Sequence, residues 1–379
     1  MGRSRINVIQ DKCKRTLIQK FEDFLDKSQI FISIYQKTDN QFLKLIEQIR
    51  QTDTIQYIKM QDWSFEQNFS NLLNLLQQSI KSQKNLNKLK IVFSQFHSFN
   101  EEESKYLKEC ITETIQNLNI KFEKTSLKNV EKILKSVKNQ ENIKVLKLQM
   151  NLKNKVNANN ILQLISKFNH LKKMRILINN SLFDVEKTVC LQLEECEYLE
   201  TSIEIINTIQ NLKLAQNLRD LTLVVDKTES NMFDRFLNIQ IPVLQNLHSL
   251  NLNVIQSDNY YLRFLESALP QLIQTSQLQI VYKNGNDTEF SKIASLLNNN
   301  NQIKQFTYYD LIKNIQFQES DFDMLFNIQH LRILALDNYQ RAYKFLRILT
   351  NLITIQLYSV KEKKNILKVK RLVSYKIGY

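Results

Sequence analysis

The chain has 379 residues, of which 43% are hydrophobic and 24% charged, and its formal net charge is +14. This length is too great for one ordinary compact core, so we expect several domains or an elongated repeat array. Only three glycines and two prolines occur, which excludes phosphate-binding loops, dinucleotide fingerprints and nucleophile elbows, because each of these needs closely spaced glycines.

Residues 1–53 form the first segment of the chain, and their apolar residues follow helical spacing. The pattern is clearest at Ile6, Ile9, Cys13, Leu17, Phe21 and Phe24. Such spacing places the apolar side chains on one face of a helix. The sequence therefore predicts that residues 1–53 are helical.

A short phrase recurs from residue 54 onward: an apolar residue, two residues, an apolar residue, then two further apolar residues at alternate positions. In "NLHSLNLNV" these are Leu247, Leu250, Leu252 and Val254. We call the second of them the key residue of its repeat. The phrase predicts key residues at Leu89, Leu118, Leu146, Met174, Leu221, Leu250, Leu278, Phe306, Leu334 and Ile355. The stretch "IQYIKM", keyed on Ile58, is a candidate for an earlier and more divergent unit.

Most neighbouring key residues are 28 or 29 positions apart, and such a constant interval indicates a repeat architecture. The gap of 47 residues between Met174 and Leu221 predicts a hidden repeat keyed near Leu191, with its boundaries open between residues 179 and 217. The last interval of 21 residues predicts a final helix that is shortened to a turn.

Each repeat divides into a strand with alternating apolar residues, a polar turn and a helical pattern such as "SLKNVEKILKSVKNQEN". Strand–helix units of this length stack most simply with parallel strands side by side and helices along the outer face. We therefore predict an α/β solenoid over residues 54–360, a horseshoe with the strands on its concave face and the helices on its convex face.

The L-x-x-L-x-L phrase in units of 28 or 29 residues resembles the leucine-rich repeat of the ribonuclease-inhibitor type, and the bias toward Asn, Gln, Ile and Lys resembles proteins of ciliates. The family places Asn or Cys five residues after the key residue, as Asn151 and Asn179 do here. The resemblance implies a non-enzymatic adaptor, inhibitor or subunit of a larger assembly. Residues 1–53 would then be a helical N-terminal cap, and residues 361–379 a basic C-terminal cap or tail.

Two alternative functions remain open at this point. Residues 1–20 carry a net charge of +5 and residues 361–379 a net charge of +6, so the 340 residues between them carry only +3. These basic ends would suit an RNA- or DNA-associated subunit of a larger assembly. A ubiquitin-ligase-type substrate receptor would carry an F-box before the repeats, but that motif opens on Leu-Pro and no proline occurs there.

The residues between the apolar positions of each strand are expected on the concave face. The first half of the array places Lys88, Lys90, Asn119, Lys121, Lys147, Gln149, Lys173 and Arg175 there, and the second half Thr222, Val224, Asn251, Asn253, Gln279, Val281, Thr307, Tyr309, Gln356 and Tyr358. In a parallel stack, Lys147 and Arg175 become neighbours about 5 Å apart, with Lys121 diagonal to them.

This face is either merely solvated or a protein-binding surface, with lysines for an acidic partner and tyrosines as anchors. The candidate partner-binding residues are Lys88, Lys90, Lys121, Lys147, Lys173, Arg175, Tyr309 and Tyr358.

No catalytic residues, cofactor or metal site are predicted. The five residues between Cys190 and Cys196 do not match a zinc motif, and the four scattered cysteines do not form a disulfide framework. The uncharged run Phe236–Ser257 contains amides that lipid would leave unsatisfied, so we expect no membrane span. Without a secretory signal, the protein is expected to be intracellular, in the cytoplasm rather than the nucleus.

Overall fold

The structure is a computed structural model of the 379-residue chain. It describes residues 29–34, 47, 49–51, 55–62, 69–93, 101–125, 127–137, 140–152, 156–157, 159–179, 183–184, 189–191, 193–210, 215–226, 230–256, 260–282, 287–310, 319–334 and 354–358. The two basic ends and most of the expected N-terminal cap lie outside these ranges. The chain divides into two compact units, Met1–Leu193 and Glu194–Tyr379, which we describe separately.

The first unit contains a sheet whose strands are all parallel and follow one another in chain order. These strands are β1 (Gln29–Ile34), β2 (Tyr57–Asp62), β3 (Lys88–Phe93), β4 (Asn117–Thr125), β5 (Val145–Leu152) and β7 (Lys173–Asn179). Their key residues stand in register, in the order Ile30, Ile58, Leu89, Leu118, Leu146 and Met174.

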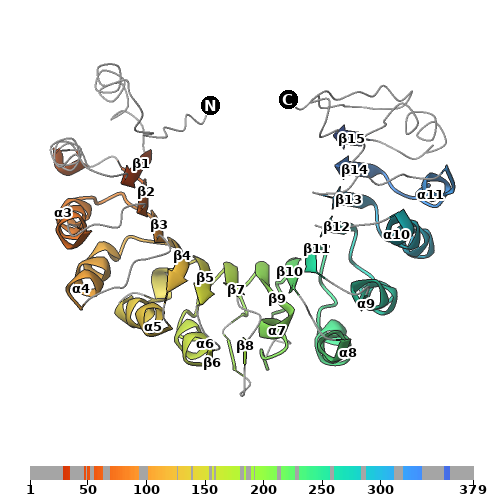
Figure 1. The fold of residues 1–379 in the computed structure, drawn as a ribbon, viewed down its shortest axis with the longest axis horizontal. Helices are drawn as coiled ribbons and strands as arrows, with labels where there is room; N and C mark the ends of the chain where they lie inside the picture. Colours follow the sequence, from red (N-terminus) through yellow and green to blue (C-terminus); the bar gives the residue numbers. More distant parts are fainter. Residues whose placement is uncertain are drawn as a thin grey trace. The chain divides into compact units, whose positions relative to one another are not determined.

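The helices of the first unit lie on one face of this sheet (Figure 1). They are α3 (Phe69–Lys81), α4 (Glu101–Cys110), α5 (Leu127–Ser136) and α6 (Asn159–Ile165), with the short 3-10 helix η1 at Gln140–Asn142. Strands β6 (Val156–Asn157) and β8 (Phe183–Asp184) pair separately in a small parallel sheet.

The second unit repeats the design with parallel strands in chain order and helices on one face (Figure 1). Its strands are β9 (Tyr198–Ser202), β10 (Asp220–Asp226), β11 (Ser249–Gln256), β12 (Gln277–Tyr282), β13 (Gln305–Asp310), β14 (His330–Leu334) and β15 (Thr354–Tyr358). Its helices are α7 (Ile203–Ile206), α8 (Ser230–Ile239), η3 (Ile241–Val243), α9 (Tyr260–Ala268), α10 (Asp287–Asn299) and α11 (Glu319–Asp323).

The core of each unit lies between its sheet and its helices. Leu118 and Leu250 are fully buried at key positions, and Val130 and Leu134 on α5 are fully buried as well. Strand side chains alternate between the two faces of a sheet, so the residues on either side of each key residue lie on the face opposite the helices. The predicted fold class is confirmed: each unit is an α/β leucine-rich-repeat solenoid with parallel strands on one face and helices on the other.

The hidden repeat was placed at the wrong residue. It is keyed on Leu199, which pairs with Leu221, and not on Leu191. The phrase was not recognised because Thr201 stands two residues after Leu199, where the phrase requires an apolar residue. The Thr201 side chain is nevertheless fully buried. Cys196 occupies the first apolar position of this phrase and is also fully buried.

The expected key residue Leu334 is wrong as well. Leu331 pairs with Phe306 and with Ile355, so the last two intervals are 25 and 24 residues. The stretch "HLRILAL" holds two overlapping frames of apolar residues, because Leu331 and Leu334 each begin an alternating run. The sequence pattern alone does not separate these frames, whereas the pairing with β13 does.

The sheet also begins earlier than expected. Residues Gln29–Ile34 form strand β1 inside the segment that was expected to be a helical cap. Its key residue Ile30 precedes Ile58 by the usual 28 positions. Lys27 stands where the phrase requires its first apolar residue, which hid this repeat from the pattern.

Side-chain amides connect successive repeats at the turn before three of the strands, β5, β10 and β11. Four residues before the key position, Asn142 donates to the Glu113 carbonyl at 3.1 Å, Asn217 to the Glu194 carbonyl at 2.6 Å, and Asn246 to the Gln216 carbonyl at 2.9 Å. The side chains of Asn151 and Asn179, at the position typical of the family, lie outside those described. The recurring amide of the described repeats therefore precedes the strand.

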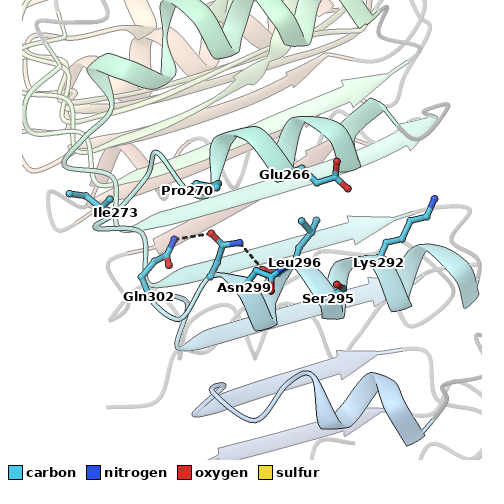
Figure 2. Close-up of a pocket in the computed structure, with 9 residues that line it drawn as sticks. Glu266, Pro270, Ile273, Lys292, Ser295, Leu296, Asn299 and Gln302 are labelled. Atoms are coloured by element: carbon cyan, nitrogen blue, oxygen red, sulfur yellow. Dashed lines mark hydrogen bonds between the residues drawn. The ribbon is translucent and has the colours of Figure 1, made fainter.

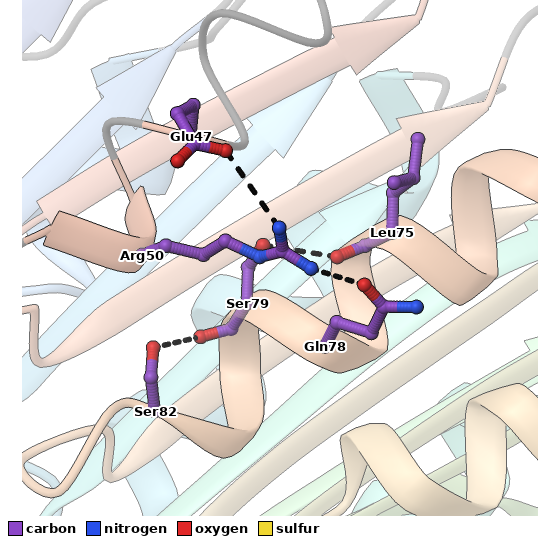
Figure 3. A network of polar contacts seen from close by, with 6 residues as sticks. All are labelled: Glu47, Arg50, Leu75, Gln78, Ser79 and Ser82. Carbon is purple, nitrogen blue, oxygen red and sulfur yellow. Dashed lines mark hydrogen bonds and ion pairs between the residues drawn. The ribbon is translucent and has the colours of Figure 1, made fainter.

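Polar contacts also join neighbouring helical segments in the first unit (Figure 3). Arg50 lies 3.7 Å from the Glu47 carboxylate and donates to the side-chain carbonyl of Gln78 on α3. Ser79 on α3 donates to the Leu75 carbonyl at 2.9 Å, a bond within the same helix. The Arg50–Gln78 contact thus ties residues 49–51 to the next repeat.

Candidate functional site

Cations concentrate on the face of the first unit's sheet that lies opposite the helices. On β2 to β5 and β7, the positions one residue before, one residue after and three residues after each key residue hold seven cations and neither Asp nor Glu, whereas Glu123 follows five residues after Leu118 on β4. We call this set the basic face: Lys59, Lys88, Lys90, Lys121, Lys147, Lys173 and Arg175.

The strand register places these cations in adjacent rows. Lys59 pairs with Lys90, and Lys147 pairs with Arg175. Lys121 pairs with Gln149, one step diagonal to Lys147. Neighbouring strands are about 4.8 Å apart, so the expected juxtaposition of Lys147, Arg175 and Lys121 is present in the structure.

Lys90 lies among other cations of the basic face. The pKa of Lys90 is lowered from its ordinary value, first by partial burial and then by the charges of Lys59, Lys121, Lys147 and Lys88. Burial and like charges both disfavour the ammonium form. An anion that approaches Lys90 would therefore stabilise its charged form.

An aromatic ring lies at one edge of the basic face. The Lys88 ammonium lies 4.3 Å from the centre of the Tyr57 ring, and the two residues are paired on β3 and β2. A cation over the face of a ring is attracted by the quadrupole of the ring. This contact fixes the Lys88 side chain beside Lys90 without neutralising its charge.

The equivalent face of the second unit is mostly uncharged. The Asn251 amide donates to the Thr222 hydroxyl at 3.2 Å, and the Tyr198 hydroxyl donates to the Glu200 carboxylate at 2.9 Å. This face carries amides, hydroxyls and a few charges of both signs, and it differs chemically from the basic face.

The two candidate tyrosines belong to this second unit. Tyr309 lies on β13, and the Arg332 guanidinium lies 5.2 Å from the centre of its ring. Tyr358 is the last residue of β15, in the same row as Tyr309 through the pairing of both with Leu334. The structure therefore divides the predicted site residues, with the cations in one unit and the tyrosines in the other.

Sequence reasoning missed four charged residues on these faces, and one of them is Arg332, which follows the corrected key residue Leu331. Lys59 belongs to the divergent phrase "IQYIKM", whose recognition as a full repeat would have identified it. Glu200 lies on β9 and is placed by the repeat keyed on Leu199, whereas Asp220 begins β10 directly before the key residue Leu221. The second half of the array is accordingly less uniformly neutral than its predicted residues indicated.

A depression of about 770 Å³ lies on the helix side of the second unit (Figure 2). Its amides serve the fold: Gln302 donates to the Leu269 carbonyl at 2.9 Å and Asn300 to the Leu296 carbonyl at 2.7 Å. Glu266 and Lys292 are the charged residues of its lining. Charged side chains are therefore much more concentrated on the basic face than in this depression.

Cys110 and Cys196 are buried and Cys190 is exposed, and burial raises the pKa of the Cys110 thiol above its ordinary value. In the described part of the chain, no three His, Cys, Asp or Glu residues are grouped as metal ligands would be. Each helix in the described part of the chain is too short or too polar to span a bilayer.

Comparisons with known proteins identify relatives by structure only. No protein-family profile and no curated protein sequence matches the chain. The leucine-rich-repeat protein LegL7 from Legionella pneumophila is 12% identical, with 89% of this chain and 92% of that chain covered and a TM-score of 0.42.

Two further solved structures are similar to the chain. A TLR13–ssRNA13 complex matches at 14% identity over 79% of this chain and 48% of that one, with a TM-score of 0.40. A protein from Bacteroides fragilis matches at 12% identity over 79% and 72%, with a TM-score of 0.37. The identification rests on the chain's own geometry, a strand–helix unit recurring mostly every 28 or 29 residues with its key residues in register. This architecture is a leucine-rich-repeat fold.

Proposed function

We propose that the chain is a non-enzymatic scaffold or adaptor that binds an acidic segment of a partner protein through the basic face, as a subunit of a complex. The observation that carries this proposal is the set of seven cations that the strand register gathers on the face of β2 to β5 and β7 opposite the helices. A rigid sheet holds these charges in fixed rows before any partner arrives.

The physical reason to expect a partner is the cost of gathering like charges. Lys147 and Arg175 are directly paired, and Lys90 is surrounded by lysines. Repulsion between such neighbours is only partly screened by water and salt when the groups are half-buried. An acidic segment would relieve this repulsion, and charge complementarity would also speed its association and select against basic partners.

Charge reversal at two paired positions tests this proposal. We expect Lys147→Glu with Arg175→Glu to leave the melting temperature within a few degrees of wild type but to reduce capture of the native partner at least tenfold. The matched control is Lys128→Glu with Lys167→Glu, which makes the same charge change at exposed positions on α5 and after α6. If both double variants capture the partner equally well, the basic face is only a solvated surface.

The competing class of partner is nucleic acid bound through the basic ends, residues 1–20 and 361–379. Binding of that kind weakens steeply with salt, because each neutralised phosphate releases counterions. A nucleic-acid titration of the full chain and of a variant lacking both ends separates the classes. Tight, salt-sensitive binding that is lost with the two ends would support nucleic acid at the ends, and tight binding that survives both deletions and higher salt would place nucleic acid on the repeats in place of the acidic protein segment.

A further inference from the structure

Four lysines surround Lys90 on the basic face. Lys59 is paired with Lys90 across β2 and β3, and Lys88 lies two residues earlier on the same strand. Lys121 lies one diagonal step away on β4, and Lys147 lies in the same row two strands away. With about 4.8 Å between strands and about 6.7 Å between alternate residues, five ammonium groups share a small area.

This compact arrangement favours an anion with several charges at one point. A carboxylate brings one negative charge and two oxygens. A phosphorylated hydroxyl brings a charge of about −1.5 to −2 and three strong acceptor oxygens, so two or three ammonium groups can bond it at once. Asn119, which is paired with Lys90 on the side away from Lys59, adds an uncharged donor amide.

We propose that the acidic segment carries a phosphorylated serine or threonine, with its phosphoryl group seated over Lys90 between Lys59, Lys121 and Asn119. This inference rests on the proposed function, because it names the chemistry of the group that the basic face recognises. The segment's other acidic residues would contact the paired cations Lys147 and Arg175 further along the face.

The surroundings of Lys90 favour a phosphorylated peptide over single-stranded RNA. Proteins that bind single strands without sequence preference combine cations with exposed aromatic rings on which bases stack. On the rows of the basic face, the aromatic residues of the first unit's described strands are Phe31 on β1, which is paired with Lys59, and Tyr57 on β2, one face of whose ring is covered by the Lys88 ammonium. The positions next to Lys90 hold three lysines, Lys59, Lys88 and Lys121, and the amide of Asn119, and these donors suit a phosphoryl group better than a stacked base.

Three degenerate nonapeptide libraries test this inference, identical except that the central residue is phosphoserine, serine or glutamate. They are passed over immobilised full-length wild type, Lys90→Ala, Lys90→Arg and Lys167→Ala, each first checked by circular dichroism and melting. We expect wild type to retain the phosphoserine library at least tenfold better than the serine library and several-fold better than the glutamate library. Lys90→Ala should reduce that retention at least fivefold, whereas Lys90→Arg and Lys167→Ala should keep most of it.

Each other result overturns the inference in a recognisable way. If wild type retains the phosphoserine and glutamate libraries equally and Lys90→Ala retains neither, the basic face recognises negative charge and not a phosphoryl group. The proposed function would still hold in that case. If Lys90→Ala and Lys167→Ala retain the phosphoserine library equally, or if wild type does not retain it, the phosphoryl site is overturned. The proposed function is then decided separately, by the partner capture of the Lys147→Glu, Arg175→Glu variant. An RNA dodecamer that displaces the phosphoserine library and itself depends on Lys90 would show that the class of partner is wrong.

Discussion

Thr201 lies at the position of β9 where the next strand, β10, has Leu223. Its side chain is fully buried, and its hydroxyl has no hydrogen-bond partner among the described residues. A hydroxyl that is removed from water without a partner costs about 1–3 kcal/mol. Thr222, one strand away, differs because it lies on the opposite face and accepts a hydrogen bond from Asn251 at 3.2 Å.

We therefore predict that Thr201→Val stabilises the protein by about 1 kcal/mol, because valine removes the buried hydroxyl and keeps the branched shape. The measurement is the midpoint of urea unfolding. Thr222→Val is the matched control and should be neutral or destabilising, since it removes a bonded hydroxyl. A lower midpoint for Thr201→Val than for wild type would show that the hydroxyl does have a partner.

At the scale of single elements, the pairing of the strands brings lysines together on the basic face, and their repulsion lowers the stability of the folded sheet. The pKa of Lys90 is lowered in the folded protein, so the folded state binds this proton less tightly than the unfolded state does. Below the folded pKa both states are charged and the folded state carries the full penalty. That penalty disappears as the pH rises through the unfolded value of about 10.4.

Lys90→Met should accordingly raise the melting temperature at about pH 7.5, because methionine keeps the apolar stem and removes the charge. The difference from wild type should narrow when the melts are repeated near pH 10. Lys167→Met, at an exposed site after α6, should change little at either pH. A Lys90→Met variant that melts below wild type would mean that the ammonium group stabilises the sheet.

The repeat phrase predicted most of the strands because their key residues are apolar and recur at a constant interval. It failed at β1, β9 and β14, and each failure has a local cause. Lys27 and Thr201 replace apolar residues of the phrase, and "HLRILAL" contains two frames. The pairing with the neighbouring strand identifies the key residue of each of these strands. A pattern along the sequence carries no information about that pairing.

The candidate cations were found for the same reason that the strands were. Lys90, Lys121, Lys147 and Arg175 follow key residues that the phrase identified correctly. Lys59 was missed with its divergent phrase. The burial of Lys90 and its cluster of neighbours could not be read from the sequence, because they depend on which strands are adjacent and on how deeply each side chain is covered.

At the scale of the whole molecule, the two units share one architecture but present different chemistry. The first unit carries the basic face, whereas the corresponding face of the second unit carries amides, hydroxyls, tyrosines and charges of both signs. The same strand–helix repeat can carry such different surfaces because the residues beside the key positions do not contribute to the core between sheet and helices. The fold thus sets the positions of these side chains, and their chemistry sets the partner.

Amine footprinting of the full chain tests the basic face most directly. The chain is labelled with an amine-acylating reagent at about pH 8, alone and bound to the partner recovered by wild type, and each lysine is quantified by mass spectrometry. We predict that the partner protects Lys90, Lys121 and Lys147 severalfold and leaves Lys128 and Lys167 unchanged. Equal labelling of all five with and without the partner, or protection confined to the two lysines on the helix side, would contradict the proposed binding surface.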